Sequence, residues 1–452
     1  MDEPSLLTAR AGERPTNARY VVLTWFCVSM ALAYMSRNAI SVAESTIRKD
    51  LGITMDESGW LLGVFFLPYA LFQIPAAQYG RHTGARWALP IFSIAWSVAT
   101  AATAFVSGLW TFVVTRAAQG IAQAGLIPTS TASVSKWFPK AGMGFATGAL
   151  GSFMSVGSAL GAALTGWMLE SFLPYTGPGR NWRLMFLVLT VPGIVWAIAF
   201  HVWFRDEPGE HKDVNEAELE LIRVGKSAET VPREPGGDGS TPWLALFTSP
   251  PLWWISGQQF FRAAGYMFFT SWFATYLQEA RHLSIPKSGL YTSLPLLAVV
   301  AGGVLGGMLS DWLLVRTGSR RIARQGMGAA CMFLCALLIF WAMTIGNAFA
   351  AVLVISLGSL LAAMGGPCAF AITIDMGGSR VAPINATMNM MGNLGALAFA
   401  VEVPRLVKRF GNWDSVLLVF GGCYIAATLF WLLLKPEGTI LEQALVRERN
   451  DG

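Results

Sequence analysis

The chain has 452 residues and a formal net charge of +5, and 54% of its residues are hydrophobic while only 13% are charged. An average soluble domain carries roughly a quarter charged residues, so a water-soluble fold could not cover this much apolar surface. The composition therefore excludes a soluble globular protein and predicts an integral, multi-pass membrane protein. The positive charge does not indicate nucleic-acid binding, because no basic run alternates with aromatic residues.

An apolar stretch of about 20 residues crosses the hydrocarbon core of a membrane as a helix, and about twelve such stretches follow one another here. The first six helices are expected at 19–46, 57–80, 86–107, 109–137, 142–171 and 182–204. The second six are expected at 250–278, 288–311, 323–344, 347–374, 382–406 and 413–434. The sequence therefore predicts an all-α membrane protein with two six-helix bundles, residues 19–204 and 250–434.

A polar segment divides the two sets of helices. Residues 205–241 are charged and contain several prolines and glycines, as is typical of a linker. Within it, Asn215 and Glu218 have the spacing of a capping box and predict a short amphipathic surface helix through Ile222. We assign residues 205–249 to a linker, and 1–18 and 435–452 to polar tails.

The basic residues predict the orientation in the membrane. Most Lys and Arg residues between helices lie on the side that carries both chain ends, among them Arg14, Arg86, Arg205 and Arg324. Under the positive-inside rule both termini are expected in the cytoplasm, and we expect a bacterial inner (plasma) membrane. No short apolar core with a small-residue cleavage site begins the chain, so a removable signal peptide is not expected.

The cysteines and histidines do not have the spacing of a metal site. The five cysteines all fall in apolar segments and are expected to be packing residues. The four histidines are scattered at helix ends and in loops. We expect neither a metal centre nor a cofactor.

The second helix and the turn after it recur in the second set. Gly59 and Gly84 have counterparts at Gly289 and Gly318, and Arg86 has one at Arg320. Repeats of this kind build transporters whose substrate site lies between the halves, near the middle of the membrane. A pore or an enzyme does not require this architecture.

Short strings spread over nearly the whole chain carry a family resemblance: Tyr34-Met35-Ser36-Arg37-Asn38, Tyr69-Ala70-Leu71-Phe72-Gln73-Ile74-Pro75, Ser135-Lys136-Trp137-Phe138-Pro139, Gly306-Gly307-Met308-Leu309-Ser310-Asp311 and Asn389-Met390-Met391-Gly392-Asn393. In order and spacing they resemble the major facilitator superfamily. Within it they resemble the anion:cation symporter family, which includes carriers of hexuronates, aldonates, phthalate and vesicular organic anions or phosphate. The resemblance implies the major facilitator fold, anion transport and a functional monomer.

Two departures from the family pattern concern gating and coupling. The loop that the family uses as a gate corresponds here to Arg81, His82 and Arg86, with Arg81-His82 where the family usually has Asp-Arg, while the second-half copy keeps Asp311 and Arg316. Proton-coupled relatives often have acids at the positions of Ser36 and Gln123. The resemblance therefore implies the gate but not the usual proton carriers.

Three arginines, Arg37, Arg116 and Arg262, lie inside expected membrane helices, where an ionisable residue is costly and indicates function. Counting the α-helical rise per residue from the start of each expected helix places Arg37 and Arg116 at a similar depth in the membrane. Two guanidinium groups facing one cavity would bind a carboxylate or a phosphate with paired hydrogen bonds. The alternative, in which each arginine pairs with a buried acid or carbonyl, stays open, above all for Arg262.

Polar and aromatic residues are expected beside the arginines. Gln119 and Gln123 share the helix face of Arg116, and Tyr34 and Tyr69 combine an apolar ring with a polar tip. In the second half, the residues at family-like places are Gln258, Tyr266, Asn389 and Asn393. Tight helix packing is the alternative role for each.

The coupling ion stays open. The remaining acids at membrane depth or its margin are Glu44, Glu170, Asp375 and Glu402, of which Glu402 is expected to lie deepest. Proton coupling through one of them, coupling to sodium or exchange, and passive facilitation are three alternatives.

The predicted function is secondary transport of a small organic anion, such as a sugar acid. The alternatives are a carrier of inorganic phosphate or organophosphate, an uncoupled facilitator or exchanger, and a membrane sensor descended from a transporter. No metalloprotease, Walker or nucleophile-elbow motif is present, so we do not expect an enzyme. The expected partners are the substrate, a proton or sodium ion, and the lipid bilayer.

Overall fold

The computed structural model describes residues 14–177, 179–227, 247–377 and 381–435, and the secondary structure of these residues is helical. The first group comprises α1 (Ala18–Leu51), α2 (Met55–Gly63), α3 (Phe66–Thr83), α4 (Ala85–Thr103), α5 (Leu109–Gln123), α6 (Leu126–Trp137), α7 (Lys140–Thr176) and α8 (Asn181–Trp203). A short 3-10 turn, η1 (Pro208–Glu210), and helix α9 (Glu216–Ser227) follow. The second group comprises α11 (Pro250–Met267), α12 (Phe273–Glu279), α13 (Ile285–Thr317), α14 (Met327–Met343), α15 (Ala348–Gly377), α16 (Val381–Phe410) and α17 (Asp414–Leu433).

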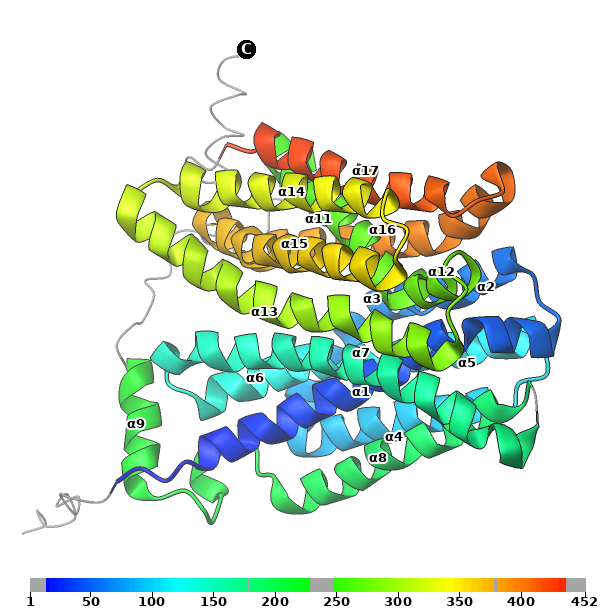
Figure 1. Ribbon diagram of the computed structural model, residues 1–452. Helices are drawn as coiled ribbons and strands as arrows, with labels where there is room; N and C mark the ends of the chain where they lie inside the picture. The colour runs from blue at the N-terminus through cyan, green and yellow to red at the C-terminus, as the bar shows by residue number, and fades with distance from the viewer. Residues whose placement is uncertain (1–13, 178, 228–246, 378–380, 436–452) are drawn as a thin grey trace, which may run out of the picture.

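The two groups lie side by side as two layers of roughly antiparallel helices, with α7 and α13 facing each other between them (Figure 1). The start of α1, the end of α17 and helix α9 lie at the same end of the molecule. We call this the terminal end and the opposite one the far end. Residues 1–13, 228–246 and 436–452, which include most of the two predicted tails and part of the predicted linker, lie outside the described residues.

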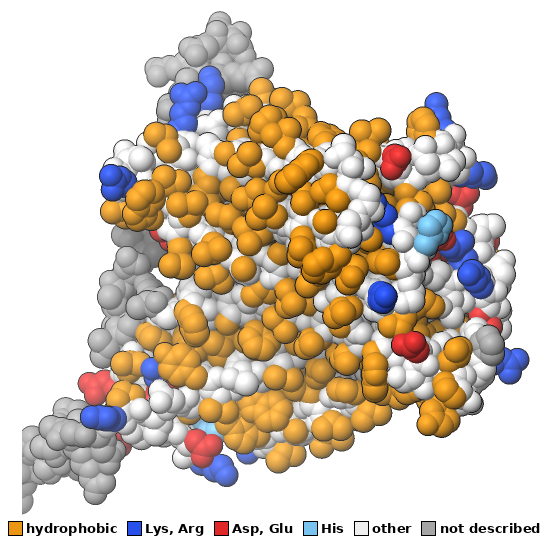
Figure 2. Space-filling model, viewed as in Figure 1, with side chains coloured by type: hydrophobic (Ala, Val, Ile, Leu, Met, Phe, Trp, Pro, Cys, Tyr) orange, Lys and Arg blue, Asp and Glu red, His pale blue; other side chains and the backbone are white. Residues whose placement is uncertain are grey.

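The surface of the helices is apolar. Nine described segments are long and apolar enough to cross a membrane. The expected helices 86–107, 109–137 and 250–278 are also present, as α4, α5 with α6, and α11 with α12. Figure 2 shows hydrophobic side chains covering most of the visible face, with charged groups gathered toward its two ends. Such a surface needs a lipid environment, so the prediction of an all-α, multi-pass membrane protein is confirmed.

Three of the predicted continuous helices are interrupted. The helix expected at 57–80 is divided between α2 and α3, and the one at 109–137 between α5 and α6. The two breaks adjoin, because a Cβ atom on Gly120 would lie 2.4 Å from the carbonyl oxygen of Phe65. The helix expected at 250–278 contains a π-helical turn, η2 (Phe268–Trp272), and a second such turn, η3 (Arg321–Gly326), precedes α14. Irregular turns of this kind are frequent at functional sites.

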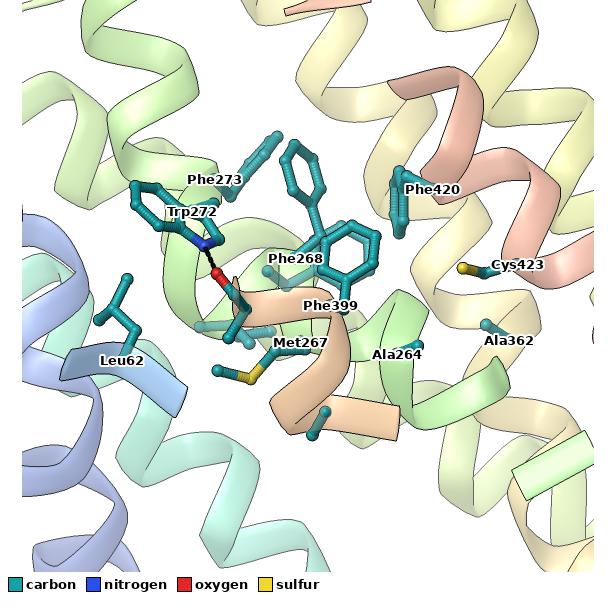
Figure 3. Packing of buried hydrophobic residues seen from close by; sticks show 14 of the residues in the cluster. Leu62, Ala264, Met267, Phe268, Trp272, Phe273, Ala362, Phe399, Phe420 and Cys423 are labelled. Carbon is teal, nitrogen blue, oxygen red and sulfur yellow. Dashed lines mark hydrogen bonds between the residues drawn. The ribbon is translucent and has the colours of Figure 1, made fainter. Parts of the chain in front are cut away.

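The π turn η2 is held by an aromatic cluster and by one hydrogen bond (Figure 3). The rings of Phe268 and Phe420 are 4.7 Å apart, and Phe269 also contacts Phe420 at 5.1 Å. The indole Nε1 of Trp272 donates a hydrogen bond of 3.0 Å to the carbonyl oxygen of Ala400 in α16. A buried indole N–H needs such a partner, and this bond fixes η2 against α16.

Helix α9 forms as predicted, but its capping box is only half made. The side-chain oxygen of Asn215 accepts a 3.0 Å hydrogen bond from the Glu218 amide, which is the expected cap. The Glu218 carboxylate does not return to Asn215, and instead accepts bonds from the Ala18 amide (3.2 Å) and the Arg19 side chain (2.9 Å). The helix also continues beyond Ile222 to Ser227. Glu218 therefore ties α9 to the start of α1.

His211 packs in the same connection, outside the membrane-spanning segments. Its ring lies against the indoles of Trp203 and Trp137, with centroid separations of 4.4 and 5.6 Å. Burial lowers the pKa of His211 below its ordinary value of 6.5, and the Asp213 carboxylate, 3.9 Å away, opposes this shift. The ring is therefore held neutral between the two indoles at physiological pH.

This burial predicts a pH dependence of stability. Because the folded-state pKa of His211 is depressed, its packing contributes stability above pH 6.5, and that contribution is lost as the pH falls through the folded-state pKa. We expect the unfolding temperature of the detergent-purified protein to fall between about pH 7 and pH 5. The fall should be smaller in a His211→Phe variant, which cannot take up a proton. Equal pH profiles for the two proteins would contradict the prediction.

Candidate functional site

Arg37 projects from the middle of α1, and three aromatic rings surround its guanidinium. Its guanidinium carbon lies 4.1 Å from the ring centre of Tyr34, 4.3 Å from that of Phe65 and 4.8 Å from that of Tyr69. Its Nε donates a 3.0 Å hydrogen bond to the side-chain oxygen of Gln123. The aromatic faces and the amide hold the guanidinium in place without neutralising its charge.

Arg116 of α5 lies directly beside Arg37. Its Nη1 donates to the side-chain oxygen of Gln119 at 2.5 Å and, more weakly, to the main-chain oxygen of Arg37 at 3.4 Å. Only 4% of Arg116 is exposed, and its Nε is buried with no hydrogen-bond partner. A buried charged donor without a partner is costly, so this atom is an unsatisfied positive group in the described structure.

Both arginines lack a carboxylate partner within the described part of the chain. Gln119 is itself oriented by Thr100, to whose hydroxyl it donates a 3.1 Å bond, and Gln123 donates to the Ala33 carbonyl at 3.1 Å. The structure thus brings together six of the predicted residues: Tyr34, Arg37, Tyr69, Arg116, Gln119 and Gln123. Of the predicted alternative, pairing with an acid is not found among the described residues, whereas Arg116 does donate to one carbonyl, that of Arg37.

On the other half, Arg262 and Tyr266 lie one turn apart on α11. The guanidinium of Arg262 donates from Nε and Nη2 to the side-chain oxygen of Gln259, at 3.1 and 2.9 Å. Tyr266 lies near Arg262 and, across the interface, near Tyr34 and Arg37. Tyr266 also lies near Ser155 in α7. These residues extend the site from the first half to the second.

The other residues predicted from the second half lie differently. Gln258 is buried within its own half, where it donates to the Ile255 carbonyl at 3.0 Å and contacts the sulfur of Met388 at 3.9 Å. Asn393 donates to the carbonyl of Asn389, one turn earlier on α16, at 3.1 Å, and Asn389 is exposed. None of these three contacts an arginine of the site in the described structure.

Three residues that the sequence reasoning missed take part in the site. Phe65 lies under both Arg37 and Arg116, at 4.3 and 5.3 Å. Gln259 orients Arg262, and Ser155 lies near Tyr266. The position of Gln259, three residues before Arg262 on one helix face, could have indicated it. No local pattern distinguishes Phe65 or Ser155.

The predicted coupling acids are separated by the fold. Glu44 is 3% exposed and lies between the two halves. Glu402, expected to lie deepest, is instead about half exposed and pairs with Arg405 of its own helix at 3.1 Å. Asp375 lies 3.8 Å from Arg324, and Glu170 is exposed. The rotation of α16 about its axis, which hydropathy does not specify, turns Glu402 away from the interior.

Glu44 belongs to a polar contact that closes the far end of the interface. Its carboxylate accepts hydrogen bonds from Arg48 at 2.8 Å and from Thr275 of α12 at 3.0 Å. Arg48 also forms an ion pair with Glu279 of α12. One turn earlier on α1, Ser45 donates to Gln278, which donates in turn to the Val42 carbonyl at 3.3 Å.

Glycines let α7 and α13 meet at the same end. A Cβ atom on Gly289 would lie 2.5 Å from the Ala162 carbonyl oxygen and 3.2 Å from the Gly166 Cα. Toward the terminal end, Cβ atoms on Gly148 or Gly307 would meet nothing within 4 Å, and the two helices diverge there in Figure 1. The halves are therefore closed together at the far end and spread toward the terminal end.

The predicted gating loops are built differently in the two halves. In the second half, Asp311 pairs with Arg324 at 3.0 Å, whereas Arg316 lies over the Trp312 ring. In the first half, the Asp206 carboxylate accepts from the Ala85 amide at 2.6 Å and so caps α4. Arg86 donates to the His201 carbonyl at 3.3 Å, and the side chains of Arg81 and His82 are exposed.

Comparison with known proteins agrees with this arrangement. The family model described as Major Facilitator Superfamily matches residues 26–400. A probable sulfoacetate transporter of Cupriavidus necator is 30% identical over 93% of this chain and 95% of its own length. A probable galactarate/D-glucarate transporter of Escherichia coli is 28% identical over 95% of this chain and 96% of its own length.

Solved structures share the fold. A bacterial homologue of the human lysosomal transporter Spinster, in an inward-facing and unoccupied conformation, aligns with a TM-score of 0.71 at 17% identity, covering 97% of this chain and 98% of that one. A D-xylose-proton symporter aligns with a TM-score of 0.70 at 14% identity, covering 92% and 98%. With a family match across most of its length and two helical groups in this arrangement, the chain belongs to the Major Facilitator Superfamily, a family of membrane transporters, and is not an enzyme.

Proposed function

We propose that this protein is a secondary transporter of a small organic anion with a carboxylate group, such as a sugar acid. The observation that carries the proposal is the adjacent pair Arg37 and Arg116, which is buried without an acidic partner among the described residues, where the Nε of Arg116 also lacks a hydrogen bond. A carboxylate is the ligand whose geometry and charge suit two such guanidiniums. The names of the relatives, which describe transporters of sulfoacetate and of galactarate or D-glucarate, support this substrate class.

Transport would proceed by alternating access. In this proposal the helix groups at 19–204 and 250–434 rock as two bodies about the arginine site. In alternating access a transporter opens to one side of the membrane or to the other. The closed far end and the spread terminal end fit the state that is open at the terminal end. With both termini in the cytoplasm of a bacterial inner membrane, as the basic residues favour, this state opens inward. We propose that a monomer is the working unit.

Inorganic phosphate is the second candidate, because two arginines also suit a phosphate. The pocket favours an organic acid over phosphate, since the rings of Tyr34, Phe65 and Tyr69 surround Arg37 and provide an apolar wall for a carbon chain. Competition by unlabelled phosphate against labelled sugar acid separates the two candidates.

For coupling, Glu44 is the acid that we propose to carry a proton, if transport is proton-coupled. It is buried between the halves and shares Arg48 with Glu279, so closing the far end places two carboxylates around one guanidinium. Like charges that share a site favour binding of a proton by one of them. Sodium coupling, exchange and passive transport remain alternatives, since Ser36 and Gln123 stand where related carriers have acids.

The test is uptake of labelled sugar acids into proteoliposomes, with and without an inward proton gradient. We expect accumulation above equilibrium with the gradient in the wild type, and only equilibration in Glu44→Gln. Glu402→Gln is the matched control and should behave as the wild type, because Glu402 lies on the exposed side of α16. Equilibration in the wild type would exclude proton coupling, and no flux of any carboxylate would overturn the proposed function.

A further inference from the structure

A cleft of about 730 Å³ lies at the far end of the molecule, between the two halves. The end of α1 and the start of α8 line it from the first half, and α12 and the start of α13 line it from the second. Ser45 and Gln278, which are hydrogen-bonded to each other across the interface, belong to its lining. Another lining residue, Lys49, lies about 18 Å beyond Arg37 along α1, at a helical rise of about 1.5 Å per residue. The cleft is therefore separate from the arginine site.

The charged side chains that line the cleft are Lys49, Asp50 and Glu279. The two acids already have cationic partners, since Asp50 forms an ion pair with Arg183 at 3.3 Å and Glu279 forms one with Arg48. Lys49 is exposed, and it forms no ion pair or hydrogen bond in the described part of the chain. Within the described structure the uncompensated charge of the lining is thus positive, which favours an anion as the ligand.

Two long helices begin at the cleft. Helix α8 begins at Asn181 and α13 at Ile285, and both residues belong to the lining. In the described structure no side chain caps either start. The first N–H groups of a helix have no partner within it, and together they carry a partial positive charge that favours an anion. The two helix starts therefore act in the same direction as Lys49.

Asn181 adds a hydrogen-bond acceptor to the cleft. Its side chain is buried, with the residue 3% exposed, and its amide nitrogen donates a 2.5 Å hydrogen bond to the Leu169 carbonyl. This bond identifies Oδ1 as the remaining atom, and Oδ1 is buried with no hydrogen-bond partner among the described residues. An unsatisfied buried acceptor is costly. A ligand hydroxyl can donate to it, whereas an ionised carboxylate cannot.

We propose that this cleft is a second anion-binding site, and that its ligand is a hydroxylated carboxylic acid. Lys49 and the starts of α8 and α13 hold the carboxylate, and a hydroxyl group of the same molecule donates to the Oδ1 of Asn181. An acid bound there lies beside the contact between Ser45 and Gln278 at which the far end is closed. The site is formed by residues other than the arginine pair, so its existence does not depend on what that pair binds.

The experiment follows the chemical reactivity of Lys49. Purified protein in detergent is treated with a water-soluble N-hydroxysuccinimide ester, and the rate of acylation at each lysine is measured by mass spectrometry of peptides. We expect about 10 mM D-gluconate to slow the acylation of Lys49 by about threefold or more. Lys408 is the matched control, because it is exposed at the same end of the molecule and lies 3.6 Å from Asp56, outside the cleft. Its rate should not change.

Matched ligands and variants then assign the contacts. D-Glucitol has the hydroxyl groups of D-gluconate without the carboxylate, and hexanoate has the carboxylate without the hydroxyl groups, so each should protect Lys49 less than D-gluconate does. Protection by D-gluconate should persist in Arg116→Ala, in which the central site is disabled. In that Arg116→Ala protein, isothermal titration should show residual binding of D-gluconate that Lys49→Gln weakens by about tenfold or more and Lys408→Gln leaves unchanged.

The outcomes separate this site from the central one. An unchanged acylation rate at Lys49 in D-gluconate, or loss of the protection in Arg116→Ala, would overturn the second site. Equal protection by D-glucitol would overturn the role of the charge, and equal protection by hexanoate would overturn the role of Asn181. Protection of Lys49 in a protein whose arginine pair binds no carboxylate would support the second site while overturning the proposed function.

Discussion

Replacing Arg116 by Ala is expected to weaken anion binding by about 30-fold or more, because removing one partner of a buried charged contact costs about 2 kcal/mol or more. Arg116 is a proposed contact of the carboxylate, and its Nε is buried with no hydrogen-bond partner among the described residues. The fold should persist, since in the described part of the chain Arg116 forms two hydrogen bonds, to Gln119 and to the Arg37 main chain. Binding is measured by titration of purified protein, and folding by its thermal unfolding temperature.

Two further variants test whether the loss of binding is specific to the guanidinium of Arg116. Arg116→Lys retains the charge but not the planar fork, so we expect an affinity between those of the wild type and Arg116→Ala. Arg81→Ala removes an exposed arginine at the end of α3 and should not change affinity. Unchanged binding by a folded Arg116→Ala protein would remove the arginine pair from the substrate site.

Replacing Gly289 by Leu is expected to prevent closure of the far end. A Cβ atom at this position would lie 2.5 Å from the Ala162 carbonyl oxygen, which is backbone of the opposite half and cannot turn aside. Overpacking of this kind costs about 1–3 kcal/mol, which shifts a two-state equilibrium by about 5- to 150-fold toward the state open at the far end. Transport should fall because the carrier no longer visits the state closed there.

A cysteine at Ser41 reports this shift. Ser41 is buried and lies one turn from both Arg37 and Ser45 on the face of α1 that leads from the site to the far end. We expect a membrane-impermeant maleimide to label Ser41→Cys faster when Gly289→Leu is also present. The five native cysteines are buried and should give a low background.

Gly307→Leu is the matched control on the same helix. Its Cβ atom would meet nothing within 4 Å, so labelling at Ser41→Cys and transport should both stay near wild-type values. Equal labelling with Gly289→Leu and with Gly307→Leu would mean that contact between α7 and α13 does not control access from the far end.

The sequence predicted the helices well, because hydropathy and helix-end signals are local. The expected span 182–204 is α8, Asn181–Trp203, and the expected span 413–434 is α17, Asp414–Leu433. The cap at Asn215 also depends only on residues three positions apart. In the same way the costly arginines inside apolar helices identified the centre of the site, where Arg37 and Arg116 lie side by side.

Features that depend on helix rotation and on neighbouring helices were decided by the tertiary structure. Hydropathy gives the depth of a residue but not the direction in which its side chain points, so the sequence favoured Glu402, expected to lie deepest, over Glu44. Only the packed helices place Glu402 beside Arg405 on the exposed side and Glu44 against α12. Likewise Asp311 pairs with Arg324, from the start of the next helix, rather than remaining with the nearby Arg316.

The sequence by itself determined that the chain crosses the membrane many times and carries three arginines at membrane depth, because both follow from the cost of placing polar groups in lipid. The tertiary structure decided which groups surround each arginine. Phe65 comes to lie under Arg37 and Arg116, while Gln259 remains the acceptor for Arg262. The Phe65 contacts join residues from different helices, whereas the Gln259 contact depends on the rotamer that Arg262 adopts. The contacts between helices arise only when close approaches, such as that of Gly120 to Phe65, bring the helices together.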